Sequence, residues 1–537
     1  METKKPSAEI PTLSGRWWLL VVSLAAFSTW WVLHERPHSA EDGLFRALCL
    51  GFGLLGTWAL LVKLDSKRQR FQALAAWLSR MPLLLLAVLA LLPTLVGAFV
   101  LDGPATNDER AYLLQAEMFS EGRLSEPLPP HADAFFRRQI MQDGERGIRY
   151  SKYAPGTAAA LTPGTWLGAP WLSVALAGIL DLLLVVAIAR KLGLQFPAGL
   201  LLVSSPVFWV MQSSFQSEVF TLPLALMGYY ALLRIQSGCS AQRWGLLIGT
   251  CAGLMLLCRP LTAVVFAVAL AFGLRKSIKG LVWAAISGLA LTLLFLAYNA
   301  ALTGDAWQTT YAAYAAAFQP LDQFGTGDPL MALQTVAAKW FFGFAGVAGV
   351  VLLGFAGLAK IRKQDGGAGL ALLIALPLVY AFHWYPGHWA YLGPIYVYET
   401  MGLLVLGVAC VLQRWPSHHR DTALVVLVFG GLLIAFSHYP VLAQQGAQRA
   451  APQLAVADAM TAGTIESAPV VFVTDMKKHT PSRPQFDALG RLSFDEREPV
   501  FLRPTFSSTT ERVQLLSELG LSGRPVYLFA GTLQRMR

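Results

Sequence analysis

Long apolar runs alternate with short loops rich in Lys and Arg along most of the chain. Each run is long enough, or nearly so, to cross a bilayer as a helix, and few of them carry a charge. The pattern therefore predicts an all-α polytopic membrane protein with about 13 transmembrane helices. The predicted spans are Trp17–Leu33, Phe45–Val62, Pro82–Leu101, Trp171–Ile188, Phe196–Val210, Val219–Leu233, two within Trp244–Leu274, Leu281–Tyr298, Trp340–Leu358, Ala368–Phe382, Val397–Leu412 and Ala423–Phe436.

The basic loops predict how the chain is oriented. The linker Lys63–Arg80 holds five basic residues and is the strongest signal for the cytoplasmic side. When the spans are counted from this linker, the N-terminus is predicted to be cytoplasmic and the C-terminus to lie on the outer, non-cytoplasmic side of the membrane. The apolar block Trp244–Leu274 is interrupted by Arg259-Pro260, which we interpret as the outer turn of a helical hairpin.

Three regions follow from this pattern. Residues 1–81 are expected to form a cytoplasmic tail and two transmembrane helices, and residues 82–440 the membrane domain with a large outer loop, 102–168. Within this loop, Thr157–Leu167 is expected to be a short helix that dips toward the membrane. Residues 441–537 are expected to form a small extramembrane α/β domain. Strand-like runs stand at Val470–Thr474, Val500–Arg503 and Val526–Phe529, and a helix begins at Ser508 and stops at Gly520.

Composition agrees with a membrane protein and excludes several soluble classes. The 537 residues are 55% hydrophobic and 14% charged, and the net charge of +10 is explained mainly by the cytoplasmic loops. The five cysteines show no metal-like spacing, so no metal site is assigned from them. No glycine-rich loop joins a strand to a helix, so a nucleotide fingerprint is absent, and no nucleic-acid partner is expected.

The acidic segment at the start of the outer loop is the first candidate for chemistry. From Asp108 onward it is predicted to be an interfacial helix with Asp108 inside its apolar arc and Glu109 at the border. A carboxylate turned inward at a membrane surface is costly and indicates a function. The apolar arc holds Ala111, Tyr112, Leu114, Ala116, Met118 and Phe119, and the polar arc holds Arg110, Glu117, Ser120 and Glu121.

Each of these two carboxylates also has a structural interpretation. Thr106 and Glu109 fit a capping box, which explains Glu109 about as well as a catalytic role does. The helix dipole favours an acidic residue at the position of Asp108. We favour catalysis for Asp108 because of the residues described next.

Basic and acidic residues elsewhere could meet the acidic segment at the outer side. Arg259 is the only charge in its apolar block, and it is either a snorkelling turn residue or a phosphate ligand. Lys152 and Tyr153 precede the dipping helix and could reach an anionic headgroup. Glu218 stands at the outer start of its helix, where a simple N-terminal charge is slightly favoured. For Asp181, a hydrogen bond to a neighbouring helix is the favoured interpretation.

Several motifs resemble the GT-C superfamily of integral-membrane glycosyltransferases, which includes protein O-mannosyltransferases and the aminoarabinose transferases of lipid A. Asn107-Asp108-Glu109 with Tyr112 resembles the family's Asp-Glu motif, and Lys152-Tyr-Ala-Pro-Gly resembles the start of its juxtamembrane helix. Further resembling stretches are Cys258–Thr262, Tyr298–Gly304 and Gly393–Glu399, the last departing at Ile395, where an Arg is expected. The resemblance covers about Pro82 to Leu412.

The resemblance implies an enzyme that moves a sugar from a polyprenyl-phosphate donor to a cell-envelope acceptor, which is a glycan, a lipid or a protein. It implies transfer at the outer face of the cell (inner) membrane, with inversion. Asp108 or Glu109 would be the base, and Lys152, Tyr153, Glu218, Arg259 and Tyr396 would bind substrate. No cofactor is assigned, and a divalent metal stays open. The alternative is a lipid or polysaccharide transporter or flippase without chemistry. The absence of a visible repeat favours the enzyme.

Overall fold

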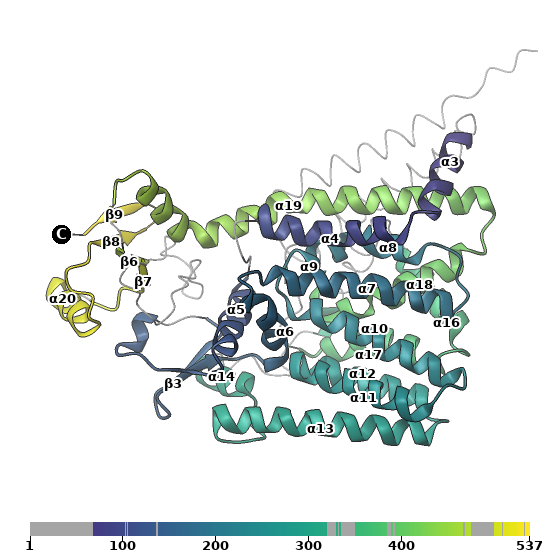
Figure 1. Ribbon diagram of the computed structural model, residues 1–537, viewed down its shortest axis with the longest axis horizontal. Helices are drawn as coiled ribbons and strands as arrows, with labels where there is room; N and C mark the ends of the chain where they lie inside the picture. The colour runs from purple at the N-terminus through teal and green to yellow at the C-terminus, as the bar shows by residue number, and fades with distance from the viewer. Residues whose placement is uncertain are drawn as a thin grey trace, which may run out of the picture.

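The computed structural model describes residues 68–536 apart from 102–103, 105, 136–137, 319–328, 331, 334–349, 384–387, 390–392, 466–467, 474–498, 507 and 531. The spans predicted at Trp17–Leu33 and Phe45–Val62 lie outside these residues. In the described part the chain forms a bundle of apolar helices with a long outer loop at one end and a small sheet domain beyond it (Figure 1).

The bundle contains most of the predicted spans. Its helices are α3 (Arg68–Ser79), α4 (Leu83–Phe99), α7 (Trp171–Lys191), α8 (Ala198–Val203), α9 (Pro206–Gln212), α10 (Ser217–Gln236), α11 (Ala241–Cys258), α12 (Pro260–Leu274), α13 (Ile278–Thr303), α16 (Val350–Ile361), α17 (Ala368–Tyr380), η3 (Ile395–Thr400), α18 (Met401–Leu412) and α19 (Ser417–Thr461). Among the described residues, six helices are long and apolar enough to cross a membrane, or seven if the bent pair α3 and α4 is one span. The protein is therefore a multi-pass membrane protein.

Helices α10 and α18 form the centre of the bundle. Every residue of α18 is buried, and α10 packs against α7, α11, α12 and α18. Helix α13 instead exposes Leu289, Leu293 and Leu294 along its outer side, as expected for a surface that faces lipid. Both helices are apolar on all sides. Their sequences therefore do not distinguish the buried α18 from the lipid-exposed α13, and the difference comes from their positions in the bundle.

The segment Phe196–Val210, predicted to be one continuous helix, forms two short helices in the structure. It is divided into α8 and α9 by Ser204 and Ser205, and Pro206 begins the second helix. Proline lacks the amide hydrogen that would continue the first helix, and its ring disfavours a helical conformation at the preceding residue. The Ser204 hydroxyl donates to the Leu200 carbonyl (2.8 Å), which satisfies part of the helix end inside the bundle.

The outer loop folds into two helices and a small sheet at one end of the bundle (Figure 1). It contains α5 (Asn107–Ser120), β1 (Glu126–Pro127), η2 (Ala132–Phe135), β2 (Ile140–Asp143), β3 (Ile148–Ser151) and α6 (Pro155–Trp166), and α14 (Thr310–Phe318) lies against β2. The antiparallel strand order is β1-β3-β2. The short α6 lies where the sequence predicted a helix at Thr157–Leu167. Strands β4 (His388–Trp389) and β5 (Gly393–Pro394) form a separate pair.

The C-terminal region is the small α/β domain that was expected. Its strands β6 (Val470–Val473), β7 (Val500–Leu502), β8 (Val526–Phe529) and β9 (Leu533–Arg535) pair in the order β7-β6-β8-β9. Helix α20 (Thr509–Glu518) begins at the Ser508 cap, and Gly520 follows its end with φ 68°. Helix α19 runs unbroken through the expected boundary at position 441 and carries the chain from the bundle to this domain (Figure 1).

The sheet domain contacts the outer loop directly. Ala134 and Phe135 of η2 belong to the same apolar core as Val500 and Leu502 of β7. The Arg503 amide donates a hydrogen bond to the Ala134 carbonyl (2.8 Å). The loop is therefore held between the bundle and the C-terminal domain.

Candidate active site

The start of helix α5 is fixed by a capping box, as the sequence predicted. The Glu109 amide donates to the Thr106 hydroxyl (3.2 Å), and Glu109 Oε1 accepts from the Thr106 amide (3.1 Å). Glu109 Oε2 also accepts from the Phe215 amide (3.0 Å), and the Gln216 side chain donates to the Thr106 hydroxyl (2.9 Å). Glu109 therefore ties α5 to the linker between α9 and α10, and both of its oxygens have structural partners.

The orientation predicted for α5 is wrong in part. Glu109 is 1% exposed and Arg110 is buried, whereas Asp108 is half-buried. The helix was expected to lie on a surface with one polar side. Instead it packs against α6 and β3 and contacts the α9–α10 linker, so protein covers residues that a single interface would leave exposed. Asp108 keeps part of its surface accessible, as a residue that meets a substrate must.

The Asp108 carboxylate has two polar neighbours from the outer loop. Its Oδ1 atom accepts a hydrogen bond from Gln139 Nε2 (2.9 Å), and its side chain also interacts with the Tyr153 hydroxyl. The Tyr153 ring lies 4.5 Å from the Tyr112 ring, centroid to centroid. Burial, followed by the nearby Asp108 charge, raises the pKa of both phenols above the ordinary value. Both hydroxyls therefore stay protonated at neutral pH and remain available as donors.

Tyr112 connects Asp108 to a second polar cluster. Its hydroxyl lies near the Ser217 side chain and interacts with it, and the charges of both Asp108 and Arg259 act on it. Ser217 lies at the start of α10, and Arg259 lies at the turn between α11 and α12. The acidic segment and the arginine that the sequence placed on the outer side thus belong to one site.

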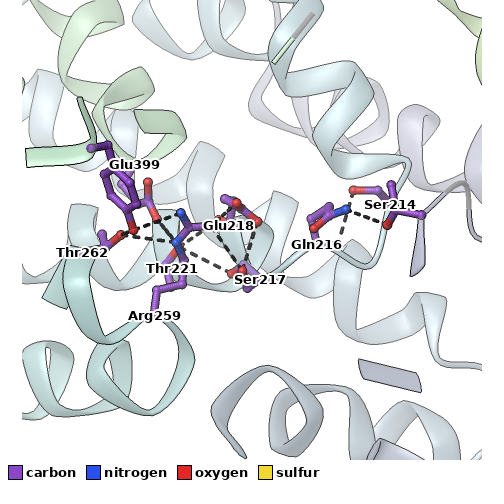
Figure 2. A network of polar contacts seen from close by, with 10 residues as sticks. Ser214, Gln216, Ser217, Glu218, Thr221, Arg259, Thr262 and Glu399 are labelled. Atoms are coloured by element: carbon purple, nitrogen blue, oxygen red, sulfur yellow. Dashed lines mark hydrogen bonds and ion pairs between the residues drawn. The ribbon is translucent and has the colours of Figure 1, made fainter. Parts of the chain in front are cut away.

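Arg259 is the centre of the second cluster (Figure 2). It forms ion pairs with Glu218 and with Glu399, the latter at 3.3 Å. Three hydroxyls also accept from its guanidinium: Ser217 (3.3 Å), Thr262 (3.2 Å) and Tyr380 (3.2 Å). Arg259 is buried, and its side chain points into the protein. The snorkelling interpretation therefore does not fit, although the predicted turn between two apolar helices does.

Glu399 was missed as a site residue, although it ends one of the motifs noted in the sequence. It is 1% exposed, and its Oε1 atom accepts from the Thr221 hydroxyl (2.7 Å) as well as pairing with Arg259. Within the described part of the chain, its Oε2 atom has no hydrogen-bond partner. The signal that could have identified it is a carboxylate at the start of an apolar helix, because burying such a charge requires a cation.

Tyr396 lies beside the same arginine. Its ring stacks on Tyr380 with centroids 4.6 Å apart, and the Arg259 guanidinium lies 5.4 Å from its centroid. The residue proposed from the Gly393–Glu399 motif is therefore part of this site. Ile395, which stands where an arginine was expected, is buried next to it.

Lys152 lies in a group of tyrosines on the outer-loop side. Its ammonium nitrogen is 4.6 to 5.3 Å from the ring centroids of Tyr153, Tyr311 and Tyr314. Its backbone is held by the Gln139 carbonyl, which accepts from the Lys152 amide (2.9 Å), and by Thr310, whose hydroxyl donates to the Lys152 carbonyl (2.9 Å). Because Tyr153 adjoins both Lys152 and Asp108, the lysine belongs to the same site.

Close packing brings α6 against the arginine turn. A Cβ atom at Gly156 would lie 2.6 Å from Cys258 Sγ and 2.7 Å from the Leu257 carbonyl carbon. Only glycine permits this approach, which holds the segment that follows Lys152 and Tyr153 next to the end of α11. Over the described ranges, no group of three or more His, Cys, Asp or Glu side chains could hold a metal ion. The divalent metal that the sequence left open stays untested.

Comparisons with known proteins identify the fold. No protein-family model matches the sequence, and no curated protein matches it. Two crystal structures of ArnT from Cupriavidus metallidurans are similar, with 14% sequence identity over 83% of this chain and 92% of ArnT. The TM-score is 0.50 for the apo structure and 0.49 for the structure bound to undecaprenyl phosphate. The apo structure shows that the chain has the fold of ArnT, and the polytopic membrane fold expected from the sequence is thereby confirmed.

Proposed function

We propose that this protein is a membrane glycosyltransferase that moves a sugar from a polyprenyl-phosphate donor to a cell-envelope acceptor. The acceptor is a hydroxyl of a glycan, a lipid or a protein. The observation that carries the proposal is Tyr112, which interacts with the half-buried Asp108 on one side and with Ser217 and Arg259 on the other. A carboxylate that can take a proton and a cation that can hold a phosphate therefore share one site. The ArnT-like fold supports the same class of enzyme.

The proposed reaction is a single displacement at the anomeric carbon. Asp108 accepts the proton of the attacking hydroxyl, and that oxygen forms a bond to the anomeric carbon while the bond to the phosphate oxygen breaks. The leaving group is the polyprenyl phosphate, which keeps the electron pair of the broken bond. Attack opposite to the leaving group inverts the anomeric configuration.

Two cations, Lys152 and Arg259, stabilise the leaving phosphate in this proposal. Lys152 lies beside Tyr153, which in turn interacts with Asp108. Lys152, Tyr153 and Asp108 all belong to the outer loop, so this loop places a cation near the proposed base. Arg259 is already paired with Glu218 and Glu399, so it takes the phosphate by exchanging a carboxylate partner. In this proposal Glu218 contributes to substrate binding through Arg259. Tyr396 presents a ring beside the same guanidinium, where a sugar face could stack.

The two acidic residues of α5 have different proposed roles. Both oxygens of Glu109 accept hydrogen bonds that hold the α5 cap and the α9–α10 linker, so its main contribution is structural. Asp108 is the more exposed carboxylate, and neither its hydrogen-bond donor Gln139 nor its neighbour Tyr153 carries a positive charge. The base is therefore assigned to Asp108.

We further propose that the reaction takes place at the outer face of the cell (inner) membrane. The N-terminus would be cytoplasmic and the C-terminal domain periplasmic or extracytoplasmic. The support is the distribution of Lys and Arg in the short loops, which is a sequence argument about orientation. A lipid-linked donor that enters from the bilayer meets the site at the outer end of the helices.

Purified protein with a panel of polyprenyl-phosphate pentoses and hexoses tests the proposal. Asp108→Asn keeps the shape and polarity of the helix start but removes the base, so transfer should fall about 10²- to 10⁴-fold while donor binding persists. Glu109→Gln is the matched control: its amide oxygen can still accept the capping hydrogen bond from Thr106, and only the acceptor for the Phe215 amide is lost. Normal transfer by Asp108→Asn with none by Glu109→Gln would mean that the base is the other carboxylate. If neither change matters, a transporter is the better account.

A further inference from the structure

Gln139 has an unusual backbone conformation next to the proposed base. Its φ is 71°, and among the described non-glycine residues only His131 and Ala468 also have positive φ. This region is disfavoured for L-amino acids with a long side chain, and such strain persists only where surrounding contacts enforce it. Strained residues of this kind cluster at functional sites, so the contacts that hold Gln139 are informative.

Three separate parts of the site hold Gln139. Its amide donates to the Tyr314 hydroxyl (3.1 Å), and its carbonyl accepts from the Lys152 amide (2.9 Å). Its side-chain nitrogen donates to Asp108 Oδ1 (2.9 Å). The two backbone contacts fix the position of the residue. Its side-chain amide therefore reaches Asp108 from a rigidly held backbone.

We propose that Gln139 is a positioning residue for Asp108, an inference that rests on the proposed glycosyl transfer. A carboxylate without a fixed orientation can rotate, and a small misplacement of a base costs much of its rate. The Gln139 amide holds Oδ1 and so directs Oδ2 toward the acceptor hydroxyl. Because the amide carries no charge, it orients the carboxylate with less loss of basicity than a lysine or arginine partner would cause.

The decisive variant is Gln139→Gly, studied in the full-length purified protein. Glycine adopts the positive φ without strain, so the loop should keep its conformation while the side-chain donor is removed. Donor binding should stay within about twofold of the unchanged protein, and kcat should fall about 10- to 100-fold. Gln139→Asn should recover part of the rate, because asparagine tolerates positive φ and keeps an amide.

A matched control lies three residues away on the same loop. The Gln142 side chain donates to the Ala132 carbonyl (2.7 Å), and among the described residues it forms no hydrogen bond with Asp108. Gln142→Ala should therefore leave kcat and donor binding unchanged. Gln139→Ala adds a further comparison, because alanine removes the amide but keeps the backbone strain. Lower thermal stability of this variant than of Gln139→Gly would verify that the strain is real.

The outcomes separate this inference from the function on which it rests. If the unchanged protein transfers sugar and Gln139→Gly does so at the same rate, Gln139 does not position the base and the inference fails alone. If Gln139→Gly loses donor binding and kcat together, its role is only to shape the loop, and the inference also fails. If the unchanged protein transfers no sugar from any donor of the panel, the proposed function fails first and this inference with it.

Discussion

Removing the positive charge of Arg259 should separate its structural role from its proposed catalytic one. Glu218 and Glu399 are each 1% exposed, and both pair with this guanidinium. In Arg259→Met, two buried carboxylates lose their cation. Breaking a buried ion pair by removing one partner costs about 3–5 kcal/mol. The variant should therefore be clearly less stable, with a thermal midpoint lower by on the order of 10 °C.

Neutralising the two carboxylates as well should restore the stability. In the triple variant Arg259→Met, Glu218→Gln, Glu399→Gln, no charge of this cluster remains, and replacing a whole buried ionic cluster is often neutral for folding. Its stability should return to within about 1 kcal/mol of the unchanged protein. Transfer should stay lost, because no guanidinium is left to hold the phosphate.

Thermal unfolding in detergent and sugar transfer, measured on the same preparations, test both expectations. If Arg259→Met is as stable as the unchanged protein, the buried carboxylates of Glu218 and Glu399 do not need the Arg259 charge for folding. If the triple variant transfers sugar normally, Arg259 has no part in binding the phosphate. Arg259→Lys is the control that keeps a charge without the planar fork, and it should retain part of the activity.

Two further predictions concern groups away from the base. Asp181 is fully buried, and its Oδ1 atom has no hydrogen-bond partner in the described part of the chain, whereas Oδ2 accepts from Gln212 (3.2 Å). Asp181→Asn should keep the thermal midpoint or raise it slightly and leave transfer unchanged, and a marked loss of either would contradict this. Hydrogen bonds from Gln514 and His131 lower the pKa of Glu518. His131 belongs to the outer loop, and its contact with Glu518 should be present at neutral pH. This contact should be lost as the pH falls through the lowered pKa of Glu518. Hydrogen exchange at residues 132–135 should then rise, and Glu518→Gln should remove this pH dependence.

Local signals in the sequence predicted the elements of the fold well. The Thr106–Glu109 capping box and the Ser508 cap both formed, because each depends on residues three positions apart. The hairpin turn at Arg259-Pro260 was also found where the apolar block is interrupted. For Asp181, the predicted hydrogen bond to a neighbouring helix is confirmed, because its partner Gln212 lies on α9.

What the sequence could not give was the set of neighbours around each element. The helical projection of α5 assumed one covered side, so it missed the burial of Arg110 and Glu109. Glu399 was overlooked because its partner Arg259 is 140 positions away (399 − 259) and reaches it only when α10, α11 and η3 pack together. Gln139 was overlooked because a positive φ is a property of the folded backbone and leaves no pattern in the sequence.

We propose above that this protein adds a sugar to the cell envelope and that Asp108 is the base of the reaction. Mass spectrometry of envelope glycans, lipids and proteins tests it most directly, comparing cells without the protein to cells that carry the unchanged chain or Asp108→Asn at equal membrane levels. We expect one or more sugar-modified species that require the unchanged chain and are missing, or reduced at least 100-fold, with Asp108→Asn. Identical envelopes in all three strains, or full restoration by Asp108→Asn, would contradict it.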